Sequence, residues 1–279
     1  MQQFGNSGQK NQRSIPSLDG LRALSIALVL LAHARGTRGF PAWLSSPSIA
    51  DHGALGVQIF FVISGFLITS LLLAEKARTG TISLGLFYAR RTLRIFPPFY
   101  AFLGMIALGR CFGAFQLQWA NLFAAAAYAM NYVAGGVWIT GHIWSLSVEE
   151  QFYLAWPLLL KLAGTKRALR LAAILALASP LFCLALYLVN RDVATRASKF
   201  FPLVADSIAS GCALAGGLGW LRKRARLFHQ FGAPWGDLVL LAVPALDLAR
   251  SHPRIHFAFA ETALNACICF LIVRYTQFP

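Results

Sequence analysis

Long apolar stretches separated by short polar connectors dominate this chain of 279 residues. An apolar run of roughly 20 residues can cross the hydrocarbon core of a bilayer as a helix. Eight stretches approach or exceed this length: 18–35, 54–74, 97–113, 143–162, 168–190, 200–221, 235–250 and 256–275. The stretch Trp119–Val133 is shorter and rich in alanine. The pattern predicts an all-α polytopic membrane protein, a bundle of about eight transmembrane helices plus one short re-entrant or interfacial helix.

Composition and charge agree with a membrane protein. Hydrophobic residues make up 57% of the chain and charged residues 13%, which excludes an ordinary soluble domain. A net charge of +15 would suit nucleic-acid binding, but the basic residues stand in connectors between apolar stretches. The richest connectors are 75–96, 161–170 and 222–226. The positive-inside rule places these connectors, and the N-terminus, in the cytoplasm, so we expect a multi-pass protein of the inner (plasma) membrane and no nucleic-acid partner.

The chain is expected to form one domain. Residues 1–16 are polar and are expected to form a flexible cytoplasmic tail, ahead of a transmembrane domain over 17–279. The five cysteines lie in or beside apolar stretches without the spacing of metal ligands, so we expect no metal and no bound cofactor.

Two ionisable residues bracket the first apolar helix. Arg22 and His33 are separated by ten residues that are all apolar except Ser25. Eleven helical steps return almost to the same face and separate the two residues by about 16 Å. Ionisable groups inside a membrane are costly and mark functional sites by default. With Asp19 on the same face, His33 is a candidate general base; the alternative is a histidine that only binds a backbone carbonyl.

A pair of arginines precedes another apolar stretch. Arg91 and Arg94 share one helix face, just before the expected start of a membrane span at Pro97 and Pro98. Two neighbouring guanidinium groups suit phosphate, because the planar fork matches phosphate oxygens. Anchoring to lipid headgroups is the alternative interpretation, and the spacing alone leaves both open.

Two carboxylates enter the apolar helix predicted over 143–162. Glu149 and Glu150 would need partners to remain ionised in a membrane, and only one of them is expected to face an internal site, at the depth of His33. The alternative is that both are solvated at the outer interface, with Trp144 and Tyr153 in an aromatic belt.

Small residues lie in the middle of the stretch 54–74. Ser64 and Gly65 would allow a close helix approach or line a narrow channel. The strand-to-helix elbow of serine hydrolases has no counterpart around Ser64.

Together these segments resemble the acyltransferase 3 family of integral membrane acyltransferases. Four segments carry the resemblance, in the family's order: Ser17–Ala23 followed by His33, Gly56–Ile68, Arg91–Tyr100 and Trp144–Pro157. Beyond residue 157 the resemblance is one of hydropathy only. Family members usually continue with further helices after the point where this chain ends, so we expect a chain that lacks the family's C-terminal helices.

The resemblance implies transfer of an acyl group, commonly acetyl, from cytoplasmic acyl-CoA as co-substrate to a hydroxyl of a carbohydrate. Acceptors in the family include O-antigen, exopolysaccharide, peptidoglycan and glycosylated small molecules. On the matching positions, His33 would be the catalytic histidine, Arg22 its motif partner and Glu149 the essential carboxylate. Arg91 and Arg94 would contact the phosphates of CoA. Other residues that could line the site are Asp19, Ser64, Trp144, Glu150 and Tyr153.

Two further questions stay open at the level of sequence. His33 could act as a base in direct transfer, or it could carry the acyl group as a covalent intermediate. The alternative function is a transporter or exporter of a glycan or lipid-linked intermediate, which would use the polar path without chemistry. The absence of a visible inverted repeat disfavours the transporter.

Overall fold

The computed structural model describes residues 16–35, 37–45, 52–114, 116–133, 138–248 and 259–278. Within these ranges every regular element is a helix, which confirms the predicted all-α class. The α-helices are α1 (Pro16–Ala34), α3 (Gly53–Thr79), α4 (Leu84–Cys111), α5 (Trp119–Ala126), α6 (Trp138–Gly141), α7 (Ile143–Leu162), α8 (Thr165–Val189), α9 (Arg191–Ala197), α10 (Phe201–Arg222), α11 (Ala225–Gln230), α12 (Val239–Leu248) and α14 (Glu261–Gln277). Three short 3-10 helices are η1 (Ala42–Ser45), η2 (Met130–Tyr132) and η3 (Pro234–Leu238). The predicted tail over 1–16 lies outside the described residues, apart from Pro16.

Five helices in the described ranges are long and apolar enough to span a membrane: α1, α3, α4, α8 and α10. The chain is therefore a multi-pass membrane protein, but the expected number of eight spans is not confirmed. The apolar stretch 235–250 divides into η3 and α12, which has 10 residues. Asp237 in η3 accepts hydrogen bonds of 2.7 Å from Nε and Nη2 of Arg274 in α14, which hold this segment in a short turn.

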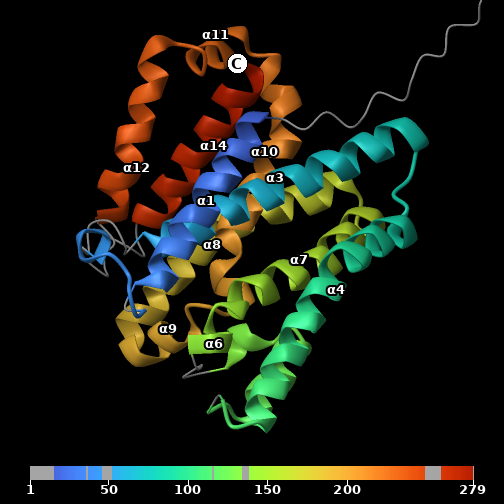
Figure 1. Ribbon diagram of the computed structural model, residues 1–279. Coiled ribbons are helices and arrows are strands. Elements are labelled where there is room, and N and C mark those ends of the chain that lie inside the picture. Colours follow the sequence, from blue (N-terminus) through green and yellow to red (C-terminus); the bar gives the residue numbers. More distant parts are fainter. Residues whose placement is uncertain are drawn as a thin grey trace, which may run out of the picture.

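The short helix expected within 119–133 is present as α5, which has eight residues. At 1.5 Å per residue it is about 12 Å long, too short to cross a bilayer. Figure 1 shows α4 on one side of the bundle and α12 and α14 on the other, with α3 between them.

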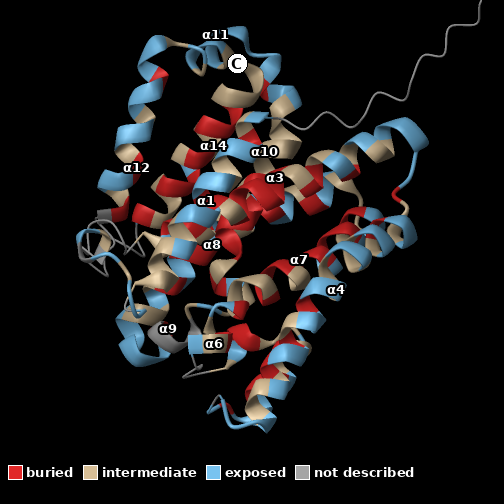
Figure 2. Cartoon of the chain, in the orientation of Figure 1, coloured by how far each residue is buried: buried red, intermediate tan, exposed pale blue. Residues whose placement is uncertain are grey.

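The centre of the bundle is the crossing of α3 and α10, where glycines bring the two backbones together. A Cβ atom on Gly65 would lie 2.0 Å from the carbonyl oxygen of Ile208, and one on Gly211 would lie 2.0 Å from that of Val62. Only glycine permits such an approach. On its other side α3 packs against α1, where a Cβ on Gly56 would lie 2.5 Å from the carbonyl oxygen of Ser25. Buried residues are accordingly frequent along α3 and α10, and also along α7 (Figure 2).

The helix α4 begins well before the apolar stretch predicted from the sequence. A membrane span was expected to begin at Pro97 and Pro98, but both prolines lie inside a continuous helix that begins at Leu84. Proline has a helical φ angle and lacks only the N–H donor, so a membrane helix tolerates it where neighbouring groups satisfy the freed carbonyls. Arg91 and Arg94 therefore lie within α4 and not at its entrance.

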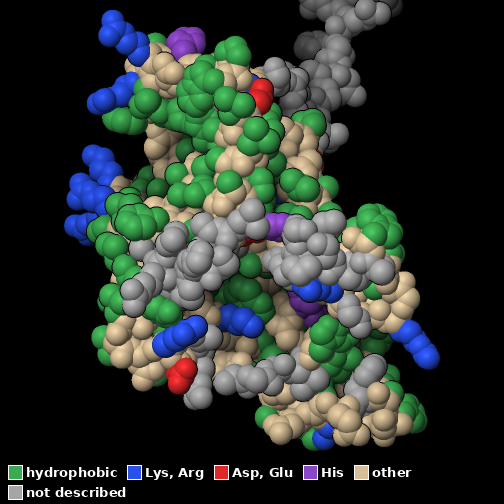
Figure 3. All heavy atoms as spheres, turned by 90° about the vertical axis from the view of Figure 1, so that its left-hand side faces the viewer, with side chains coloured by type: hydrophobic (Ala, Val, Ile, Leu, Met, Phe, Trp, Pro, Cys, Tyr) green, Lys and Arg blue, Asp and Glu red, His purple; other side chains and the backbone are tan. Residues whose placement is uncertain are grey.

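The outer surface carries large apolar side chains. Leu30, Leu93, Leu177 and Leu241 are each more than 60% exposed. Hydrophobic side chains cover much of the face seen in Figure 3, while lysines and arginines stand mainly at its edges. Such a surface suits contact with lipid.

Candidate active site

His33 lies in the last turn of α1, and its ring is held in one orientation. Its Nδ1 atom lies 2.8 Å from the carbonyl oxygen of Val29. A carbonyl oxygen only accepts, so Nδ1 carries the hydrogen and donates it. In the neutral ring the other nitrogen, Nε2, then has the free lone pair. His33 is thus arranged to accept a proton at Nε2.

A second histidine lies beside His33. His142 stands immediately before α7, and the centres of the two rings are 5.8 Å apart in an edge-to-face arrangement. Burial, followed by the electrostatic effect of His33, lowers the pKa of His142. His142 is not among the residues predicted from the sequence, although it lies two positions before the Trp144–Pro157 segment.

The carboxylate of Glu149 is buried at the contact of α3 and α7. Ser64 Oγ of α3 donates a hydrogen bond of 2.6 Å to Glu149 Oε1, and the hydroxyl of Tyr153, one turn later on α7, donates to the same oxygen. The guanidinium carbon of Arg91 lies 4.6 Å from the centre of the Tyr153 ring. Arg91 and Arg22 are the cations whose charges act on Glu149. Four residues predicted for the site, Ser64, Arg91, Glu149 and Tyr153, therefore come together from α3, α4 and α7.

An open cavity of about 590 Å³ lies between α4 and α7, and we call it the α4–α7 groove. Its lining is mostly apolar and includes Phe60, Pro98 and Phe102. Its charged and titratable lining residues are Arg94, His142 and Glu149. The groove thus joins one arginine of the predicted phosphate site to the carboxylate and to the neighbour of His33.

Glu149 lies farther along α7 than His142, the residue that neighbours His33. Glu149 follows His142 by seven residues, which corresponds to about 10 Å along a helix. The neighbour of His33 on α7 is therefore His142, while Glu149 lies farther along the helix, within the electrostatic range of Arg22 and Arg91.

The remaining predicted residues take other positions. Asp19 lies 4.0 Å from Arg22 on the partly exposed face of α1. The Nε atom of Arg22 and Oε1 of Glu150 are buried without a hydrogen-bond partner. Trp144 lines a different cavity, between α3 and α10. Asp19, Glu150 and Trp144 are not among the described residues that line the α4–α7 groove.

His33, Glu149 and the arginines Arg91 and Arg94 belong to the segments that resemble the motifs of a known family. A family model for the acyltransferase domain matches residues 15–273. The chain belongs to the acyltransferase 3 family. Its match extends through α8, α10 and α14, where the sequence alone offered only hydropathy.

Curated relatives of this family member are named as O-acetyltransferases. The peptidoglycan O-acetyltransferase OatA of Listeria monocytogenes is 30% identical over 226 residues, which is 74% of this chain and 34% of the relative. The O-acetyltransferase OatA of Staphylococcus aureus is 37% identical over 165 residues, covering 53% of this chain and 25% of the relative. The chain thus spans about a third of the length of the first relative and a quarter of the second. No solved structure matches it.

Proposed function

We propose that this chain transfers an acetyl group from acetyl-CoA to a hydroxyl of a cell-envelope carbohydrate such as peptidoglycan, with His33 as the base. The observation that carries the proposal is the hydrogen bond from His33 Nδ1 to Val29, which leaves Nε2 as a proton acceptor, while the neighbouring His142 lines the α4–α7 groove. The names of the curated relatives support acetyl as the group and a carbohydrate as the acceptor.

The reaction needs one proton transfer and one acyl transfer. His33 Nε2 removes the proton of the acceptor hydroxyl as its oxygen attacks the thioester carbonyl. A carbon–oxygen bond forms, the carbon–sulfur bond breaks, and the imidazolium returns its proton to the departing thiolate of CoA. The products are the acetyl ester and free CoA, so the atoms and charges balance.

The donor would occupy the α4–α7 groove. Its apolar walls suit the pantetheine arm, and Arg94, with Arg91 close by, suits the phosphates. Both arginines belong to the basic segment 75–96, which supports a cytoplasmic position for the nucleotide end of the donor, with the chain in the plasma membrane and its N-terminus inside.

The test is acetyl transfer by the purified chain in lipid nanodiscs, with radiolabelled acetyl-CoA and peptidoglycan oligosaccharides. Label is expected in the glycan, and mass spectrometry should show the increment of one acetyl group. In Arg94→Ala the KM for acetyl-CoA should rise about tenfold, because a charge-assisted hydrogen bond to phosphate is lost. The matched variant Arg90→Ala, which removes an exposed arginine of the same helix, should leave KM within about twofold. Absence of label in the glycan with the unaltered chain would overturn the proposed function.

A second prediction compares two neighbouring acidic residues of α7, Glu149 and Glu150, of which Glu150 is the control. Glu149→Gln replaces the acidic oxygen that accepts the hydrogen bonds from Ser64 and Tyr153 by an amide oxygen and so weakens both bonds. We expect kcat to fall by roughly 10- to 100-fold, the value of hydrogen bonds to a charged group. Glu150→Gln should change kcat by less than about threefold, because its Oε1 has no hydrogen-bond partner to lose. Equal losses of kcat in the two variants would contradict the proposal that Glu149 is the essential carboxylate.

A further inference from the structure

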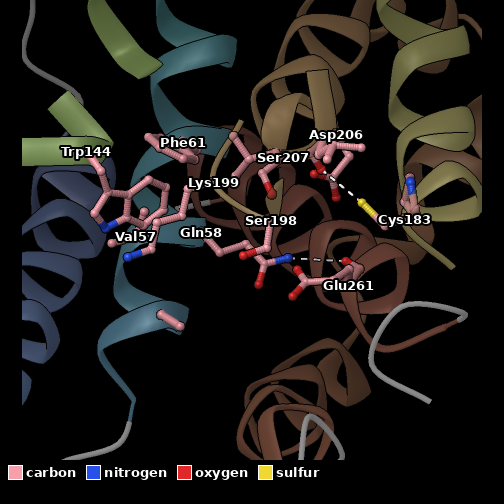
Figure 4. Close-up of a pocket in the computed structure, with 14 residues that line it drawn as sticks. Val57, Gln58, Phe61, Trp144, Cys183, Ser198, Lys199, Asp206, Ser207 and Glu261 are labelled. Carbon is pink, nitrogen blue, oxygen red and sulfur yellow. Dashed lines mark hydrogen bonds between the residues drawn. The ribbon is translucent and has the colours of Figure 1, made fainter. Parts of the chain in front are cut away.

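A second cavity, of about 240 Å³, lies between α3, α7, α8, α10 and α14. One wall is aromatic: the rings of Phe61 and Trp144 meet edge to face, with their centres 6.1 Å apart. The other wall carries the polar side chains of Gln58, Asp206 and Glu261. Figure 4 shows the aromatic residues at one end of this cavity and the two carboxylates at the other. We call it the α3–α10 cavity.

The polar wall is held by hydrogen bonds between three helices. Gln58 Nε2 of α3 donates to Asn265 Oδ1 of α14 at 2.9 Å, and Asn265 Nδ2 donates to Asp206 Oδ2 of α10 at 2.7 Å. These contacts fix the amides and direct their donors to protein atoms. A carboxylate offers about four acceptor positions and no donor. The carboxyl groups of Asp206 and Glu261 therefore offer acceptor positions to a ligand that carries O–H or N–H groups.

The α3–α10 cavity and the proposed donor site differ in the charged residues that line them. Two acidic side chains, Asp206 of α10 and Glu261 of α14, line the cavity, so its polar wall does not suit an anion. The arginine suited to phosphate, Arg94, lines the other cavity, the α4–α7 groove. The cation on the wall of the α3–α10 cavity, Lys199, is exposed and lies 5.4 Å from the centre of the Trp144 ring. The charges favour a ligand that is neutral and rich in hydroxyls.

The position of the cavity along the helices matches that of His33. Its lining residues come from the N-terminal ends of α3, α7, α10 and α14. The basic connectors 75–96, 161–170 and 222–226 follow the opposite ends of α3, α7 and α10. α1 runs antiparallel to α3, since Gly53 meets Ala32 while Gly56 meets Ser25. His33, in the last turn of α1, therefore lies at the same end of the bundle as the cavity.

We propose that the α3–α10 cavity binds one sugar ring of the acceptor carbohydrate, namely the ring next to the one that is acetylated. This inference rests on the proposed function. A sugar ring has an apolar C–H face, which suits Trp144 and Phe61, and a hydroxyl edge, which suits the carboxylates. The volume has room for one such ring.

The geometry of α7 explains why the bound ring is the neighbour. Trp144 follows His142 by two residues, so the two side chains leave α7 about 200° apart. A ring packed on Trp144 and the imidazole of His33, which contacts His142, thus lie on two sides of the start of α7. An oligosaccharide that crosses this point presents its next ring to His33. A single sugar that fills the cavity would not reach the base.

The experiment measures binding of radiolabelled N,N′-diacetylchitobiose to the full chain in nanodiscs by equilibrium dialysis. Val57→Phe fills the cavity, and Glu261→Gln removes one of its charges while keeping the shape. Each variant should weaken disaccharide binding about tenfold or more, as expected for a lost hydrogen bond to a charge or for steric exclusion. The matched control Ala155→Phe adds the same ring to an apolar cavity between α7 and α10, and binding should be unchanged. Glucosamine 6-phosphate should fail to compete, because it is anionic at the phosphate.

The possible results distinguish a failure of the proposed sugar-binding site from a failure of the proposed acetyl transfer. Absence of disaccharide binding by the unaltered chain, or equal binding by a folded Glu261→Gln variant, overturns the proposed site. Binding that is lost in the cavity variants but is not followed by acetyl transfer upholds the site and overturns the proposed function. Transfer to the disaccharide with unchanged KM in Val57→Phe upholds the function and overturns the site. Size-exclusion profiles and melting temperatures confirm that each variant is folded.

Discussion

Replacing His33 by alanine should lower kcat for acetyl transfer by about 10²- to 10⁴-fold, the usual contribution of a positioned general base. The hydrogen bond from Nδ1 to Val29 fixes the ring and leaves Nε2 as the only nitrogen that can accept a proton in the neutral form. The side chain is partly buried in the last turn of α1, so its removal should leave the helix packing intact. Activity is measured with radiolabelled acetyl-CoA, and folding by the melting temperature.

Two matched variants make the His33 result specific. His229→Ala removes an exposed histidine of α11 and should retain full activity. His33→Gln retains a polar side chain that can hydrogen-bond but cannot take up a proton near neutral pH. We expect it to be as inactive as His33→Ala. Full retention of acetyl transfer in His33→Gln would exclude His33 as the general base.

Replacing Gly211 by valine should prevent folding of the bundle. A Cβ atom at this position would lie 2.0 Å from the carbonyl oxygen of Val62 and 2.7 Å from the backbone nitrogen of Phe66. These are backbone atoms of α3 that cannot rotate away, so α3 and α10 would have to separate. Overpacking of flexible cores costs about 1–3 kcal/mol, and a rigid contact should cost at least the upper end of that range. The measurement is the yield of monodisperse protein after detergent extraction.

The control for this prediction lies on the same helix. A Cβ atom on Gly217 would meet no heavy atom within 4 Å, so Gly217→Val tests the effect of valine on α10 without the contact to α3. Its yield should match that of the unaltered chain. A normal yield for Gly211→Val would show that the backbones of α3 and α10 do not approach as closely as the structure describes.

The sequence by itself determined the helical class, the membrane character and the grouping of residues along single helices. Arg22 and His33 share α1, and Arg91 and Arg94 share α4, because the helical period is a local property of the chain. Hydropathy also predicted that the segment around Trp119 forms only a short helix. These features depend on residues close together in the chain, so they need no knowledge of packing.

The tertiary structure decided which of these residues meet. Ser64 and Glu149 are 85 residues apart in sequence and share a hydrogen bond. His142, which precedes α7, lies beside His33 of α1. The α3–α10 cavity joins Gln58 and Asp206 through Asn265 of α14. Such contacts depend on how closely helices cross, which the glycines at the α3–α10 crossing set through backbone contacts. The hydropathy of a single stretch does not encode the position of its partner, and this is why the composition of the site came only from the packed structure.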